Sequence, residues 1–117
     1  MAEQGYNGFP NVETWRVQLH LSNDERATAT VCAIAELYAG RFKVWGIPPG
    51  SHYPDTFGEW LRQWVEDRTG CTEPGGDTYA MLARDTVQAA LARVDWEHLS
   101  RLWLDTAQHE AARRVQS

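Results

Sequence analysis

The sequence predicts an all-α protein, a compact single-domain bundle of about five amphipathic helices over residues 1–117. Apolar residues recur every three or four positions through most of the chain, which is the period of a helix with one buried face. Capping residues, glycines and prolines separate these stretches. Hydrophobic residues make up 43% of the chain and charged residues 23%, a balance typical of folded proteins, and 117 residues are too few for two domains.

The N-terminal part is expected to begin with an irregular arm. Residues 1–10 contain two glycines and a proline, residue types that favour turns. Asn11 can then cap the segment 12–21. Apolar residues in that segment fit a helical stripe and also the alternation of a strand, so both structures stay open, and we favour a short helix.

A second helix is predicted between the run S-N-D-E at residues 22–25 and Gly40. The run supplies capping side chains followed by an acid that suits the positive end of the helix dipole. Residues 41–54 contain two glycines, three prolines and three aromatic residues. This composition predicts a proline-rich loop that aromatic side chains hold against the body.

Three further helices are predicted in the second half of the chain. Thr56 and Glu59 have the spacing of a capping box and begin the third. Asp95 caps the fifth, which ends near two arginines that suit its negative end. The fourth begins at Thr78, and its inward face should contain Leu82, Ala83, Val87, Ala90 and Leu91.

Composition also excludes several classes of protein. No apolar run approaches the 18 or so residues of a membrane span, and residues 1–10 lack the pattern of a signal peptide, so we expect a cytoplasmic protein without membrane contact. The two cysteines, Cys32 and Cys71, are too few for a disulfide framework and should be reduced. The net charge of −5 opposes phosphate neutralisation, so no direct nucleic-acid binding is expected.

Linear motifs for catalysis or for a bound group are not recognisable. Asp105 and His109 lie four residues apart and can face one ion, but nothing near them completes a tetrahedral site. The glycine pair at 75–76 lacks the lysine of a phosphate-binding loop. We therefore predict no catalytic residue, no metal site and no cofactor.

Acidic residues gather between positions 55 and 77, where six acids stand against two arginines. Such a segment can bind a basic surface of a partner. The alternative is a solvated face, because Glu59 and Glu66 have salt-bridging spacings from Arg62 on the predicted helix. Trp45, in the predicted loop, is the tryptophan best placed to be an exposed anchor. The candidate partner-binding residues are Asp55, Glu59, Glu66, Asp67, Glu73, Asp77 and Trp45.

Three stretches resemble a known family. They read G-Y-N-G followed by N-V-E-T-W-R-V-Q-L-H-L-S-N-D within residues 5–24, D-T-F-G-E-W-L-R-Q-W-V-E-D at 55–67, and A-L-A-R-V-D-W-E-H-L at 90–99. They are similar to a family of small uncharacterised proteins of phages, plasmids and other mobile elements, whose opening motif is Y-N-G…N-x-E-T-W…N-D. Val12 stands where that family often has tyrosine. The resemblance implies a mobile-element context and brings no catalytic residues with it.

The leading hypothesis is a non-enzymatic, protein-binding accessory protein of a mobile element. Small acidic proteins in that context often bind and block a host machine, so the resemblance implies an inhibitor of a host defence complex, CRISPR or restriction, that acts through its acidic surface. Its partner would be a host protein or nucleoprotein complex. A homodimer is also compatible with amphipathic helices rich in tryptophan.

Two other classes of function stay open at this point. One is a small enzyme whose site is assembled from scattered polar residues, namely Glu13, His20, His52 and Asp55. The other is a helical nucleic-acid-binding domain that uses a cluster formed by Arg16, Arg26, Arg41 and Lys43.

Overall fold

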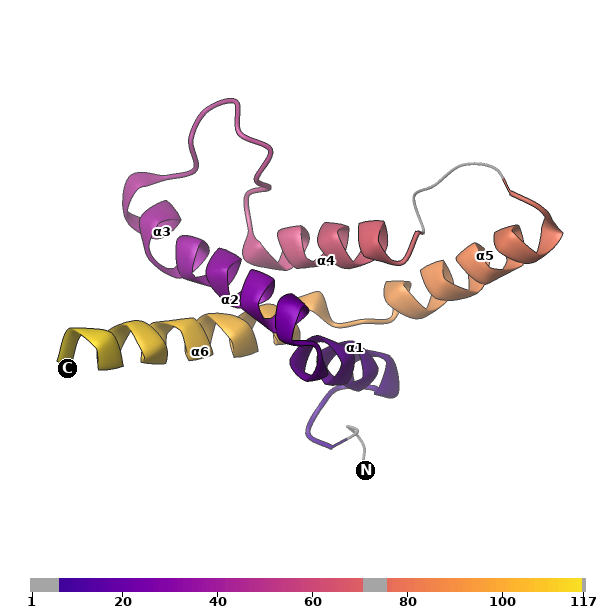
Figure 1. Ribbon diagram of the computed structural model, residues 1–117, viewed down its shortest axis with the longest axis horizontal. Helices are drawn as coiled ribbons and strands as arrows, with labels where there is room; N and C mark the ends of the chain where they lie inside the picture. The colour runs from indigo at the N-terminus through magenta and orange to yellow at the C-terminus, as the bar shows by residue number, and fades with distance from the viewer. Residues whose placement is uncertain (1–6, 71–75, 117) are drawn as a thin grey trace.

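The chain folds into helices joined by mostly short connections (Figure 1). The computed structural model describes residues 7–70 and 76–116, and no β-strand occurs within those ranges. The predicted all-α fold is therefore confirmed, with a short additional helix near the middle of the chain. The helices are α1 (Val12–Asn23), α2 (Glu25–Ala39), α3 (Arg41–Trp45), α4 (Phe57–Arg68), α5 (Thr78–Ala92) and α6 (Trp96–Gln116). None of the helices in the described ranges combines the length and the apolar character needed to cross a bilayer.

The start of α1 decides the structure of the segment 12–21. Asn11 has an extended backbone, with φ −158° and ψ 172°. Its side-chain oxygen accepts hydrogen bonds from the backbone N–H of Thr14 at 2.8 Å and from the Thr14 hydroxyl at 2.6 Å. A capping asparagine satisfies N–H groups that the first turn of a helix leaves without partners. The favoured helix is thus confirmed, and the strand alternative is wrong.

Thr14 also fastens α1 to the connection between α5 and α6. Its side chain is fully buried, and its hydroxyl oxygen accepts a 2.8 Å hydrogen bond from the N–H of Asp95. The side-chain amide of Asn11 donates to the carbonyl of Arg93 at 2.7 Å, and Oε2 of Glu13 lies 3.3 Å from Nε of Arg93. The N-x-E-T part of the opening motif therefore joins two distant segments of the chain.

The hydrophobic core lies between α2, α4 and α6, and α1 packs beside it. Trp103 on α6 is buried, and its Nε1 donates to the side-chain oxygen of Gln18 on α1 at 2.8 Å. A buried indole usually finds such a partner. The core residues are Leu21, Val31, Ala35, Phe57, Leu61, Val65, Leu91, Val94, Leu99, Trp103 and Ala107.

Helix α5 extends away from the rest of the molecule, and only its C-terminal half packs against it (Figure 1). Leu91 is 7% exposed, whereas Leu82 is 61% and Tyr79 80% exposed. The prediction that Leu82 and Ala83 face inward is wrong, because α5 diverges from the other described helices and its first turns have no helix to pack on. The radius of gyration of 16.0 Å accordingly exceeds the roughly 13 Å typical of a domain of this length.

The segment 41–54, predicted as a loop, begins with the short helix α3. Phe42 is buried, and its ring meets the rings of Tyr38 and Tyr53 edge-on, with centroids 5.0 and 5.1 Å apart. Gly46 ends α3 with a φ of +83°, a conformation that favours glycine. Burial of Phe42 requires the chain to turn back at once, and one helical turn does so. The loop prediction is wrong for 41–45, and the predicted aromatic contacts are confirmed for Phe42 and Tyr53, whereas Trp45 is exposed.

Caps confirm the starts of the later helices. Thr56 accepts a hydrogen bond from the N–H of Glu59 at 3.2 Å, and Asp95 accepts one from the N–H of His98 at 3.0 Å. Residues 7–10 of the predicted arm are non-helical, and the rest of the arm lies outside the described residues. Cys32 is a free, half-buried thiol, and burial raises its pKa; Cys71 lies outside the described residues.

Candidate binding groove

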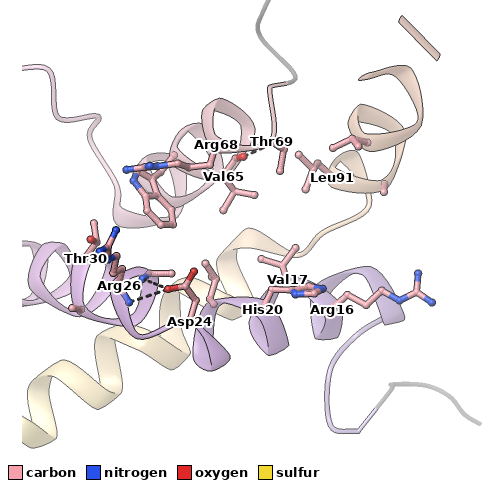
Figure 2. A pocket seen from close by; sticks show the side chains of 16 residues that line it. Arg16, Val17, His20, Asp24, Arg26, Thr30, Val65, Arg68, Thr69 and Leu91 are labelled. Carbon is pink, nitrogen blue, oxygen red and sulfur yellow. Dashed lines mark hydrogen bonds between the residues drawn. The ribbon is translucent and has the colours of Figure 1, made fainter. Parts of the chain in front are cut away.

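An open groove lies where α1, α2, α4 and α5 meet (Figure 2). It has a volume of about 1010 Å³. Sites for small molecules have a similar size and apolar walls, but they also enclose most of the ligand, which this open groove does not do. The floor is apolar and is formed by side chains at the edge of the core, namely Val17, Leu21, Ala27, Val65, Val87 and Leu91.

The corner between α1 and α2 builds one wall of the groove. The Asp24 carboxylate accepts hydrogen bonds from the N–H groups of Arg26 and Ala27 at 2.9 and 3.2 Å, and thereby caps α2. The hydroxyl of Thr28 donates to the carbonyl of Leu21 at 2.6 Å, across the corner. These bonds fix the angle at which α2 leaves α1, so that one face of each helix borders the groove.

The opposite wall includes Trp64 of α4, the last ring of a stacked ladder along that helix. Phe57 and Trp60 have centroids 5.9 Å apart at an interplanar angle of 12°, and Trp60 and Trp64 follow at 5.7 Å and 15°. The guanidinium carbon of Arg68 lies 5.1 Å from the centroid of the Trp64 ring, a cation–π contact. Residues three and four apart share a helix face, so the spacing 57, 60, 64, 68 produces this ladder. Trp64 and Arg68 border the groove.

Basic side chains surround the apolar floor. Arg16, His20 and Arg26 lie on the side of α1 and α2, and Arg68 lies across from them on α4 (Figure 2). All four are exposed. Asp24 is the only acid among the described residues that line the groove, and its carboxylate caps α2. A chain with a net charge of −5 therefore has a locally positive rim here.

Two of the predicted partner-binding acids are paired within α4. Glu59 and Glu66 both form ion pairs with Arg62, and Nη1 of Arg62 lies 3.4 Å from Oε2 of Glu66. Hydrogen bonds from Arg62 and Gln63 lower the pKa of Glu59. This part of the acidic segment has the internal pairing of a solvated helix face.

The other predicted partner-binding residues lie far apart in the fold. Asp55 precedes α4, Asp67 is in its last turn, and Asp77 caps α5; all three are exposed. Trp45 is 82% exposed, as an anchor would be. It ends α3, on the opposite side of the molecule from the start of α5 (Figure 1). Glu73 lies outside the described residues. The structure therefore does not gather the six described residues into one patch.

A smaller hollow of about 410 Å³ is lined by both tryptophans of α4 and shares Trp64 with the groove. Gln63, Glu66 and Asp67 line it together with His52, Trp60 and Trp64. Two of the predicted acids thus border one hollow, beside a histidine from the preceding loop. Among the residues that the structure describes, no group of three or more His, Cys, Asp and Glu side chains is arranged to hold a metal ion. His109 instead donates from Nδ1 to the carbonyl of Asp105 at 2.9 Å.

The residues of the two alternative functions are separated. His20 lines the groove, His52 lines the smaller hollow and Glu13 pairs with Arg93, so the residues of the enzyme hypothesis do not share one cleft. Arg41 and Lys43 lie on α3, away from the arginines of the groove (Figure 1). The basic residues of the nucleic-acid hypothesis therefore do not form one face.

A comparison with known families bears on the first half of the groove. Residues 2–46 match the model of a family of unknown function, DUF7249. The matched stretch includes α1, α2 and α3, and with them the capping residues of the opening motif and three of the four basic rim residues. The α4 and α5 walls lie outside it. No curated protein and no solved structure matches the chain.

The groove is not evident from the sequence, which places Arg16 and Arg26 only in a candidate basic cluster with Arg41 and Lys43. A local signal was present, because Arg16 and His20 are four residues apart beside an apolar stripe of α1. The positions of α4 and α5 opposite that stripe are a tertiary feature, which no local pattern encodes.

Proposed function

We propose that this protein is a non-enzymatic protein-binding module and that it holds its partner in the groove between α1, α2, α4 and α5. The observation that supports the proposal is the combination of an apolar floor and an exposed cationic rim. Covering the floor removes apolar surface from water, which favours association. The rim charges can orient the partner.

The geometry favours a macromolecular partner over a small substrate. Sites for small molecules enclose most of the ligand surface, and a few polar groups of the site point toward the ligand. Here the charged groups belong to three helices and stand at the exposed edges of an open floor (Figure 2). They are placed to contact the surface of an extended occupant and not one reacting atom.

The exposed acids support a second contact within the same proposal. Asp55 and Asp67 lie at either end of α4 and are exposed, and carboxylates so placed can meet a basic surface of a partner. The family resemblance implies a host defence complex as the partner class. Such a complex is therefore the first candidate partner to test.

A blocked-groove variant tests the proposal. Ala29 and Ala33 are exposed positions one turn apart on α2, and only Ala29 lines the groove. Tagged wild-type protein, Ala29→Trp and the matched control Ala33→Trp would each be incubated with host extract. We expect one protein or complex to be retained by the wild type and by Ala33→Trp, and lost with Ala29→Trp. Equal retention by both variants, or no specific retention by the wild type, would refute binding in the groove.

A further inference from the structure

We infer that the occupant of the groove is an amphipathic helix of another protein, with acidic residues on both sides of its apolar stripe. The inference rests on the proposed function and adds the chemistry of the partner. The sequence, which is acidic as a whole, predicts a partner with a basic surface. The basic rim of the groove instead favours a partner with an acidic surface.

The floor fits one face of a helix. It runs between four helices, as in complexes where an amphipathic helix lies in a groove and inserts residues spaced three and four apart. The side of α5 that borders the groove through Val87 and Leu91 continues one and two turns earlier at Ala83 and Ala80. These alanines are exposed and small, so a helix that leaves the groove along α5 can approach it closely.

The rim fits acidic flanks on both sides of that helix. Arg16 and Arg26 stand on either side of His20 along α1 and α2, and Arg68 faces them from α4 (Figure 2). Within the described part of the chain, neither Arg16 nor Arg26 forms an ion pair. Their guanidinium groups are therefore free to pair with carboxylates of an occupant.

The distribution of charge argues against two other occupants. A fatty acid or similar small anion presents one charged head, which cations on three helices around an open floor do not match. A nucleic acid requires a continuous track of cations along its phosphates, whereas the floor here is apolar and the net charge of the chain is −5.

Synthetic peptides test the inference on the full chain. The probe is a fluorescent 18-residue helix of roughly five turns, with leucines on one stripe and glutamates along both edges. A second peptide has lysines in place of the glutamates, and a third has the first composition without a stripe. Binding would be measured by fluorescence anisotropy at low and at high salt. We expect the glutamate peptide to bind about tenfold more tightly than either other peptide, and to weaken as salt increases.

Two double charge reversals locate the binding. The double variant Arg16→Glu with Arg26→Glu replaces two positive charges of the rim by negative charges. Arg41→Glu with Lys43→Glu makes the same change in net charge on α3, where both residues are exposed. We expect the rim variant to bind the glutamate peptide about tenfold more weakly than the wild type, and the α3 variant to bind it as the wild type does. Circular dichroism would check that both variants fold.

Several results would overturn the inference. These are equal or tighter binding of the lysine peptide, equal weakening by both double variants, and displacement of the peptide by a single-stranded oligonucleotide at equal concentration. A stable dimer in sedimentation that excludes the peptide would assign the groove to a second copy. If the glutamate peptide fails to bind while Ala29→Trp still abolishes retention of a host protein, the partner chemistry is wrong and the proposed function stands.

Discussion

Replacing Thr14 by valine keeps the shape of the side chain and removes only its hydroxyl group. That hydroxyl donates to the side chain of Asn11 at 2.6 Å and accepts from the N–H of Asp95 at 2.8 Å. Thr14 is fully buried, so water cannot replace the lost oxygen without rearrangement. The substitution therefore isolates the polar contact between α1 and the start of α6.

The size of the effect follows from the two bonds. Loss of the hydrogen bond to Asn11 costs about 1 kcal/mol, and a partly buried N–H of Asp95 without a partner costs a further 1 to 3 kcal/mol or so. We expect Thr14→Val to lower the free energy of unfolding by about 2 to 4 kcal/mol. With a urea m-value of about 2 kcal/mol/M, the midpoint falls by about 1 to 2 M.

Urea unfolding followed by far-ultraviolet circular dichroism measures this change. The matched control is Thr106→Val, because the Thr106 hydroxyl is exposed and only donates to the carbonyl of Leu102 at 3.0 Å within α6. The control should stay within about 0.5 kcal/mol of the wild type. A Thr14→Val midpoint equal to that of the control would refute a stabilising role for the buried contact.

Three further predictions concern α5, Tyr38 and the exposed acids. Leu82→Glu should change the free energy of unfolding by less than about 0.5 kcal/mol because Leu82 is 61% exposed, whereas Leu91→Ala should cost about 2 to 5 kcal/mol; similar losses in urea unfolding would mean that α5 packs along its whole length. Burial, with Tyr53 and Asp55 nearby, raises the pKa of Tyr38 to about 12, so the stability due to its protonated hydroxyl is present below pH 10 or so and declines as the pH rises toward that pKa. Tyr38→Phe should remove this decline in alkaline unfolding curves, and an unchanged decline would contradict the assignment. Asp55→Asn with Asp67→Asn should weaken retention of a host complex at low salt only; retention unaffected at low salt would exclude the acidic contact.

Local patterns predicted most of the helices, because their caps act over three or four residues. Asn11, Thr56 and Asp95 each accept a hydrogen bond from the first turn of the helix that follows. Segment 12–21 was ambiguous because its apolar residues also alternate. The cap by Asn11 is local, but the bond that holds this helix in place joins Thr14 to Asp95, 81 residues away, and is not visible in any local window.

Other features depend on tertiary structure and could not be predicted. Leu82 lies on an apolar stripe, and yet it is exposed because α5 diverges from the helices that would cover it. The acidic segment has a large negative charge in the sequence. In the structure, however, two of its acids, Glu59 and Glu66, are paired with Arg62 within α4. Conversely, the groove combines Arg16 with Arg68 from a helix about 50 residues away, so local charge counts do not reveal it.

The hydrogen bonds of α1 to residues 93 and 95 can form only late in the synthesis of the chain. Asn11 and Thr14 must wait for partners that follow 82 and 81 residues later. At a translation rate of about 5 to 20 residues per second, this interval lasts about 4 to 16 s. Until then α1 has its own cap but no buried environment for Thr14. Two residues within the stretch 2–46 that matches the family model, Asn11 and Thr14, therefore depend for these bonds on residues far outside that stretch.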